Sequence, residues 1–140
     1  RKCHAIDART GKEIWTVDGG RESIALSRDG SKIFVKNMFN SIQCWSTLSD
    51  DPRLEWNIQS GLGYDIAPTP SVALLLKDGR EMLIVPTDKG NIFCFEGKNG
   101  NLVWKHKISV ALINSIEPIG QDKLLISTMD GVVTMLFMTF

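Results

Sequence analysis

The stretch that decides the fold is AIDARTGKEIW, residues 5–15, because it aligns without a gap on CFEGKNGNLVW, residues 94–104. Each segment is typical of a strand, a tight glycine-containing turn and a second strand that ends in tryptophan. A third copy runs from Cys44 to Trp56 and keeps both ends, while LSDDPR, residues 48–53, replaces the glycine turn. The chain therefore contains repeated β-hairpins.

The hairpins recur at the period of a propeller blade. Their closing tryptophans, Trp15, Trp56 and Trp104, are separated by roughly the ~40–50 residues of one four-stranded blade. A second signal precedes each hairpin: TDKGNI at 87–92 matches TMDGVV at 128–133, and NMFNSI at 37–42 is a weaker copy. The apolar runs before these turns, at 33–35, 82–85 and 124–126, predict central strands buried on both faces.

These signals predict an all-β chain, a β-propeller segment of about three four-stranded antiparallel blades and part of a larger ring. We expect a blade remainder at 1–20, a blade at 21–60, a blade at 61–108 and a partial blade at 109–140, about thirteen strands in all. The last blade lacks its outermost strand. We therefore expect Arg1 to be a truncation point and Phe140 a natural C-terminus, with missing blades supplied by upstream chain or a second copy.

An apolar strand that ends in Ala-x-Asp, followed by Thr-Gly-Lys-x-x-x-Trp, resembles the pyrroloquinoline-quinone-type, or quinoprotein-like, β-propeller repeat. The resemblance is strongest from His4 to Trp15, good from Pro70 to Trp104 and partial from Ser23 to Trp56. It implies that Trp15, Trp56 and Trp104 pack between blades. The family contains quinone- and calcium-dependent dehydrogenases and also non-catalytic members, such as propellers like the outer-membrane assembly lipoprotein.

Composition excludes several functions. Lys and Arg number 16, as do Asp and Glu, so the formal net charge is +0 and nothing favours nucleic acid. No apolar run has the length of a transmembrane helix. The cysteines Cys3, Cys44 and Cys94 form no CxxC pair, and neither His4 nor His106 has a second metal ligand at a useful spacing. We therefore predict no metal, no cofactor and no catalytic residues.

The connections between blades are the candidate binding segments, because loops on a rigid scaffold commonly carry binding residues. In the longest of them, residues 61–70, Tyr64 and Asp65 are candidates for contact with a ligand or partner. Arg21 and Asn114 lie in the two equivalent connections, so a peptide or acidic ligand could contact Arg21, Tyr64 and Asn114 together. The competing interpretation is that glycine and proline only shape these crossovers. Asp50 and Asp51 are interpreted as turn residues whose side chains bond the local backbone.

The sequence thus predicts a non-catalytic scaffold for protein or ligand binding, not an enzyme, and the C-terminal part of a larger cell-envelope protein. Its partner would be a protein or peptide. The resemblance alone implies a periplasmic or cell-envelope location. Two alternatives stay open: a fragment of a quinone-dependent dehydrogenase, and an accessory propeller domain of a hydrolase such as a phosphoesterase. Fold alone does not decide among them.

Overall fold

The computed structural model describes residues 2–19, 23–37, 41–59 and 69–140, and these residues form strands joined by turns, with no helix. The N-terminal half contains β1 (Lys2–Ile6), β2 (Glu13–Asp18), β3 (Ile24–Leu26), β4 (Lys32–Lys36), β5 (Ser41–Ser46) and β6 (Arg53–Gln59). The C-terminal half contains β7 (Val72–Leu75), β8 (Glu81–Pro86), β9 (Asn91–Glu96), β10 (Leu102–Lys107), β11 (Ile113–Ile119), β12 (Lys123–Thr128) and β13 (Val133–Phe137).

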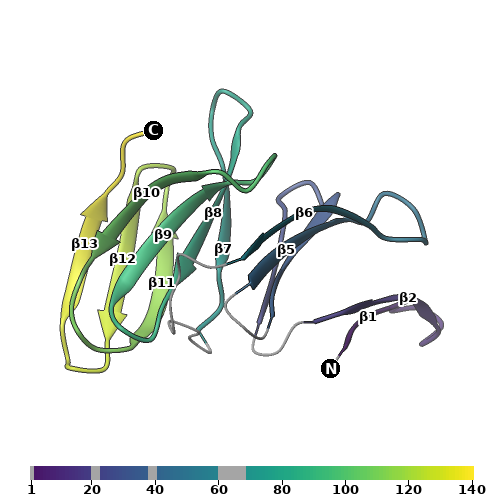
Figure 1. Cartoon of the computed structure of the whole chain (residues 1–140), viewed down its shortest axis with the longest axis horizontal. Coiled ribbons are helices and arrows are strands. Elements are labelled where there is room, and N and C mark those ends of the chain that lie inside the picture. Colours follow the sequence, from purple (N-terminus) through teal and green to yellow (C-terminus); the bar gives the residue numbers. More distant parts are fainter. Residues whose placement is uncertain (1, 20–22, 38–40, 60–68) are drawn as a thin grey trace.

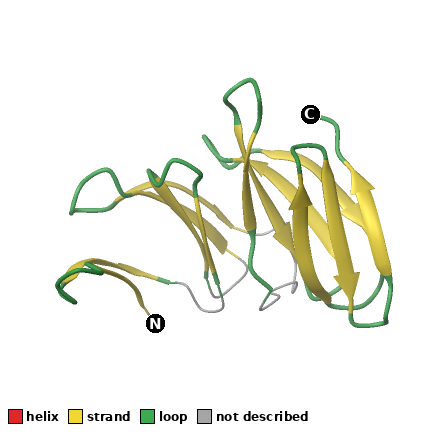
Figure 2. Ribbon diagram, turned by 180° about the vertical axis from the view of Figure 1, so that it is seen from behind, coloured by secondary structure: helices red, strands yellow, loops and turns green. Residues whose placement is uncertain are grey.

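The strands form four antiparallel sheets, ordered β1-β2, β3-β4-β5-β6, β7-β8-β9-β10 and β11-β12-β13. Each strand pairs with its neighbour in sequence, as in the blades of a propeller. The sheets follow one another from the N-terminal hairpin to the C-terminal sheet (Figure 1). They do not close into a ring, and the sheet β11–β13 lies at the opposite end of the molecule from β1 and β2 (Figure 2). The predicted all-β propeller segment, with its outer pair, two sets of four and a set of three strands, is confirmed.

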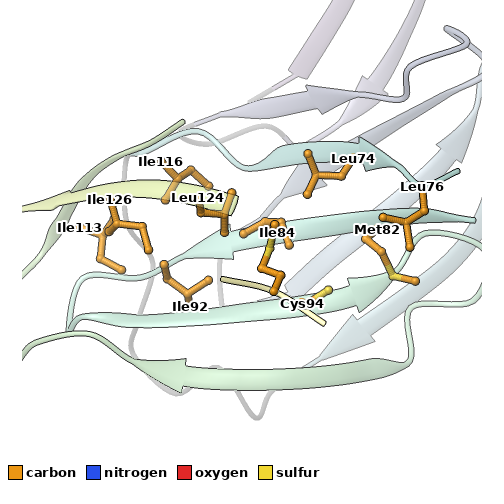
Figure 3. Close-up of a cluster of buried hydrophobic side chains, with 11 residues drawn as sticks. Leu74, Leu76, Met82, Ile84, Ile92, Cys94, Ile113, Ile116, Leu124 and Ile126 are labelled. Atoms are coloured by element: carbon orange, nitrogen blue, oxygen red, sulfur yellow. The ribbon is translucent and has the colours of Figure 1, made fainter. Parts of the chain in front are cut away.

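Apolar clusters fill the three joints between successive sheets. Val17 packs with Ile33 and Val35 at the first joint. Phe34 packs with Leu83, Val85 and their neighbours at the second joint. The third joint, between β7–β10 and β11–β13, is the largest cluster (Figure 3), and its fully buried members include Met82, Ile84, Ile92, Cys94, Ile113, Leu124 and Ile126. Alternate residues of each central strand thus serve opposite joints.

The closing tryptophans lie at these joints. Trp15, Trp56 and Trp104 are each partly buried against the first, second and third cluster, respectively. Polar bonds add to the packing: the buried amino group of Lys36 donates to the carbonyl oxygens of Pro86, at 3.1 Å, and Thr69, at 3.3 Å. A buried ammonium group requires such partners. These contacts link the sheet β3–β6 to the sheet β7–β10.

One expectation about burial is wrong for part of the chain. The run at 82–85 is fully buried, as predicted, but in the run at 124–126 Leu125 is exposed while Leu124 and Ile126 are buried. The reason is that β12 has a neighbouring sheet on one face only. Separately, the part of the chain that the structure describes has no helix of the length and hydropathy needed to span a bilayer.

Candidate functional site

Of the four predicted binding residues, only Asn114 lies in the part of the chain that the structure describes. Asn114 lies in β11, exposed, at a bulge between Ile113 and Ser115 rather than in a loop. Arg21, Tyr64 and Asp65 lie outside the described residues. The proposed joint contact of Arg21, Tyr64 and Asn114 therefore stays a prediction.

A different surface stands out, which we call the outer face of the last sheet. Strand pairing places side chains of β11, β12 and β13 alternately on the face toward β7–β10 and on this opposite face. Its apolar members are Ile119, Leu125, Val133, Met135 and Phe137, with exposed fractions of 40, 36, 68, 39 and 70%. An apolar patch of this kind on a sheet is typical of an interaction surface.

The preceding sheet shows what these positions do when they are covered. Three backbone hydrogen bonds occupy the same place in successive sheets: Thr47 N to Ser31 O, Gly97 N to Glu81 O, and Met138 N to Asp122 O. Counted from these bonds along the paired strands, Ile84, Ile92 and Cys94 are equivalent to Leu125, Val133 and Met135. Ile84, Ile92 and Cys94 are 0% exposed, because the sheet β11–β13 covers them.

The edge of the last sheet at β13 lacks the fourth strand that the two preceding sheets have. In the two four-stranded sheets a fourth strand, β6 or β10, pairs with the third, whereas within the described residues β13 pairs only with β12. Unpaired backbone groups at such an edge can pair with another strand. A hollow of about 200 Å³ lies beside this edge, between β10 and the segment 136–139. The outer face and the edge of β13 thus adjoin.

The equivalent tryptophans Trp56 and Trp104 differ in whether the indole N–H has a hydrogen-bond acceptor. The indole Nε1 of Trp56 donates to the carbonyl oxygen of Gly97 in the β9–β10 hairpin, at 2.9 Å. The indole Nε1 of Trp104 is buried but has no hydrogen-bond partner among the described residues, and its ring lies against that of Phe140, with centroids 6.5 Å apart. A buried hydrogen-bond donor without an acceptor destabilises the folded state. The third joint therefore lacks, beside Trp104, an acceptor like the Gly97 carbonyl that Trp56 has at the second joint.

The surroundings of the described cysteines and of His4 decide what chemistry these side chains can do. Burial raises the pKa of the Cys44 and Cys94 thiols to about 12 and also raises the pKa of Cys3, so none is an activated thiolate. His4 bonds to Glu13 at 2.6 Å on the exposed face of the N-terminal hairpin. No group of three or more His, Cys, Asp or Glu in these residues could hold a metal ion.

The acidic hairpin at 50–51 also has a structural explanation, although a different one from that expected. The hydroxyl of Ser49 accepts from Asp51 N, at 3.3 Å, and donates to Asp51 O, at 3.0 Å. Ser49, rather than either aspartate side chain, therefore makes the local backbone contacts of this turn.

Sequence reasoning missed the outer face because a strand like LLI at 124–126 carries no sign of whether a neighbour covers it. The signal that pointed toward it was the strand count, since the last repeat has three strands where the others have four. Trp104 could have been singled out by the same count, because its partner hairpin belongs to that last repeat.

Comparisons with known proteins agree with this architecture. A family model described as "Outer membrane protein assembly factor BamB" matches residues 2–139. Among solved structures, the crystal structure of BamB from Moraxella catarrhalis is similar, with a TM-score of 0.72 and 17% sequence identity. The match covers 91% of this chain but 37% of that one, so this chain corresponds to only part of its length. No curated protein sequence matches the chain.

Proposed function

Since the chain belongs to the family of the outer membrane protein assembly factor BamB, we propose that it is a non-catalytic propeller scaffold that binds protein through the outer face of its last sheet. The family supports an assembly role at the cell envelope, and we extend to this chain a periplasmic or cell-envelope location within a longer protein. The likeness in fold covers the described sheets.

One observation carries the proposal: the outer face of the last sheet exposes Leu125, Val133 and Met135, beside polar side chains, where their equivalents in β7–β10 are sealed. Val133 and Phe137 are about 70% exposed, while Ile84, Ile92 and Cys94 are 0% exposed. Removal of apolar area from water contributes roughly 25 cal/mol per Å². A partner that covered this face would therefore gain the kind of stabilisation that already holds the other sheets together.

The partner that fits is another antiparallel sheet of the same repeat, with aliphatic side chains on its facing side. Each joint in the structure is made by two such sheets, and the unpaired edge of β13 would also accept a fourth strand. Such a sheet supplies the apolar surface, and the fourth strand beside β13 would bring the hairpin carbonyl that Trp104 lacks. We infer that further blades of a longer protein present it.

The experiment is to replace Val133 and Phe137 together by Lys and to measure mass in solution and binding of a hydrophobic dye. We expect the unsubstituted chain to bind the dye and to self-associate as concentration rises, and the double variant to be monomeric with little dye bound. Leu48→Lys is the matched control, because Leu48 is 80% exposed but lies at a hairpin tip. A monomeric, dye-free parent chain would contradict the proposal.

The proposed absence of catalysis has its own test. Pyrroloquinoline quinone added with calcium should leave the melting temperature unchanged and give no dye-linked oxidation of alcohols or glucose. A raised melting temperature together with turnover would instead favour a quinone-dependent dehydrogenase.

A further inference from the structure

The hollow of about 200 Å³ beside the edge of β13 has two walls. Trp104 and His106 of β10 belong to one wall, and residues 136–139, which end β13 and follow it, form the other. The indole Nε1 of Trp104 is buried and has no hydrogen-bond partner among the described residues. Because buried polar groups in folded proteins are normally paired, this wall fits an occupant that gives the indole an acceptor.

The same wall exists at the second joint, where a turn covers it. Counted along the paired strands, Trp56 and Ile58 of β6 are the equivalents of Trp104 and His106. The β9–β10 hairpin covers Trp56 and Ile58 with Gly100, a buried turn residue with a φ of 76°. A Cβ at Gly100 would lie 2.8 Å from Trp56 Cε3 and 3.0 Å from Ile58 Cγ2. Glycine is therefore required here both by the backbone conformation and by the close contact.

The second joint also identifies the acceptor that the Trp104 indole lacks. Trp56 Nε1 donates to Gly97 O at 2.9 Å, and the equivalent backbone bonds of the three sheets put Met138 in the place of Gly97. The Met138 carbonyl is thus the acceptor that Trp104 would meet if a hairpin followed β13. In the structure the ring of Phe140 lies against Trp104 instead, with centroids 6.5 Å apart.

We propose that this hollow is the seat of a glycine turn that leads into a strand paired with β13. Its occupant is a segment of the longer protein, and seating the turn displaces Phe140 and directs the Met138 carbonyl to the Trp104 indole. Any side chain at the seated residue would collide with Trp104, as it would at Gly100 with Trp56. This inference rests on the proposed function, because the segment supplies the fourth strand of the last sheet.

The test extends the full chain after Phe140 with GNLVWKHK, the sequence of residues 100–107. Phe140 is equivalent to Asn99 by the same count, so the added glycine falls where Gly100 lies in its own hairpin. The matched control is the same extension with its glycine replaced by alanine. All these chains carry Val133→Lys, on the outer face of the last sheet and not in the lining of the hollow, to limit self-association.

Two measurements compare the parent and the two extended chains. We expect the glycine extension to raise the urea midpoint and to slow hydrogen exchange of the Trp104 indole N–H at least about fivefold, because the indole gains an acceptor. The alanine extension should raise the midpoint less and leave the exchange rate unchanged. The indole signal is assigned by its loss in Trp104→Phe.

A third comparison separates the seat from the strain of the turn itself. On a Trp104→Leu background the difference between the two extensions should shrink, because the smaller side chain leaves room for a Cβ. An undiminished difference would mean that the positive φ alone requires glycine, which contradicts the proposal.

Equal midpoints and equal exchange rates for the two extensions would also overturn the proposal, as would no rise in midpoint with either extension. The added strand covers the edge of β13 and not the outer face of the last sheet, so dye binding by the unsubstituted chain is an independent readout. If the seat fails while that dye binding is observed, the proposed function stands. A dye-free parent chain removes both.

Discussion

The sheet β7–β10 and the sheet β11–β13 are copies of one repeat that differ in what surrounds them. The first has a neighbouring sheet on both faces, and Met82, Leu83, Ile84 and Val85 of its strand β8 are all buried. The second has a neighbour on one face, and its other face exposes Leu125, Met135 and further apolar residues. The same apolar pattern is thus a core in one place and an interaction surface in the other.

The largest expected effect is a difference in the free energy of unfolding between substitutions at equivalent residues of β8 and β12. Ile84→Ala should lower the free energy of unfolding by about 3 kcal/mol, because it opens a cavity in the joint of Figure 3. Leu125→Ala should cost about 1 kcal/mol or less, because that side chain is 36% exposed. Urea unfolding of both variants measures the difference. Equal costs would mean that the two faces are not distinguished by burial.

Equivalent turn glycines give the next effect. Gly90 and Gly131 both have positive φ, of 76° and 83°, which disfavours any other residue. A Cβ at Gly90 would also lie 2.1 Å from Ser109 O, whereas one at Gly131 meets nothing within 4 Å. Gly131→Ala should therefore cost about 1 kcal/mol and Gly90→Ala at least about twice that. Thermal unfolding measures both, and a smaller cost at Gly90 would refute the close contact.

A smaller effect concerns the two joint tryptophans. Trp56→Phe removes the indole donor to Gly97 O and should cost about 1 kcal/mol. Trp104→Phe removes a buried donor that has no partner among the described residues, so stability should stay the same or rise. The comparison is made by urea unfolding of the two variants in parallel. A clear loss in Trp104→Phe would show that this indole already has a partner.

The smallest effect on stability comes from thiols. Met135→Cys places a thiol on the exposed equivalent of Cys94, and it should react with a thiol reagent at pH 8 while Cys94 stays protected until unfolding. Burial raises the pKa of Cys94 to about 12. Its contribution to stability is therefore complete below the pKa of about 9 that the thiol has when unfolded and is lost as pH rises from there toward 12. Rapid labelling of Cys94 in the folded chain would be inconsistent with the sealed joint.

Local sequence was sufficient to predict the strands, but it was not sufficient to predict which strand faces are buried and which are exposed. The aligned hairpins and glycine turns predicted the sheets, because alternation and turn chemistry are local properties. Whether Leu125 is buried depends on a neighbouring sheet, which no local pattern encodes. Lys36 reads as an ordinary surface lysine but is buried against the Thr69 and Pro86 carbonyls.

The central claim is that a partner covers the outer face of the last sheet, and methionine oxidation tests it most directly. In the isolated chain Met135 should oxidise and Met82 should not, since they are 39% and 0% exposed. In a longer cell-envelope protein that contains this chain, Met135 should become protected, while Met129, 63% exposed in the β12–β13 turn, continues to react. Met135 reacting equally fast in both proteins would contradict the account.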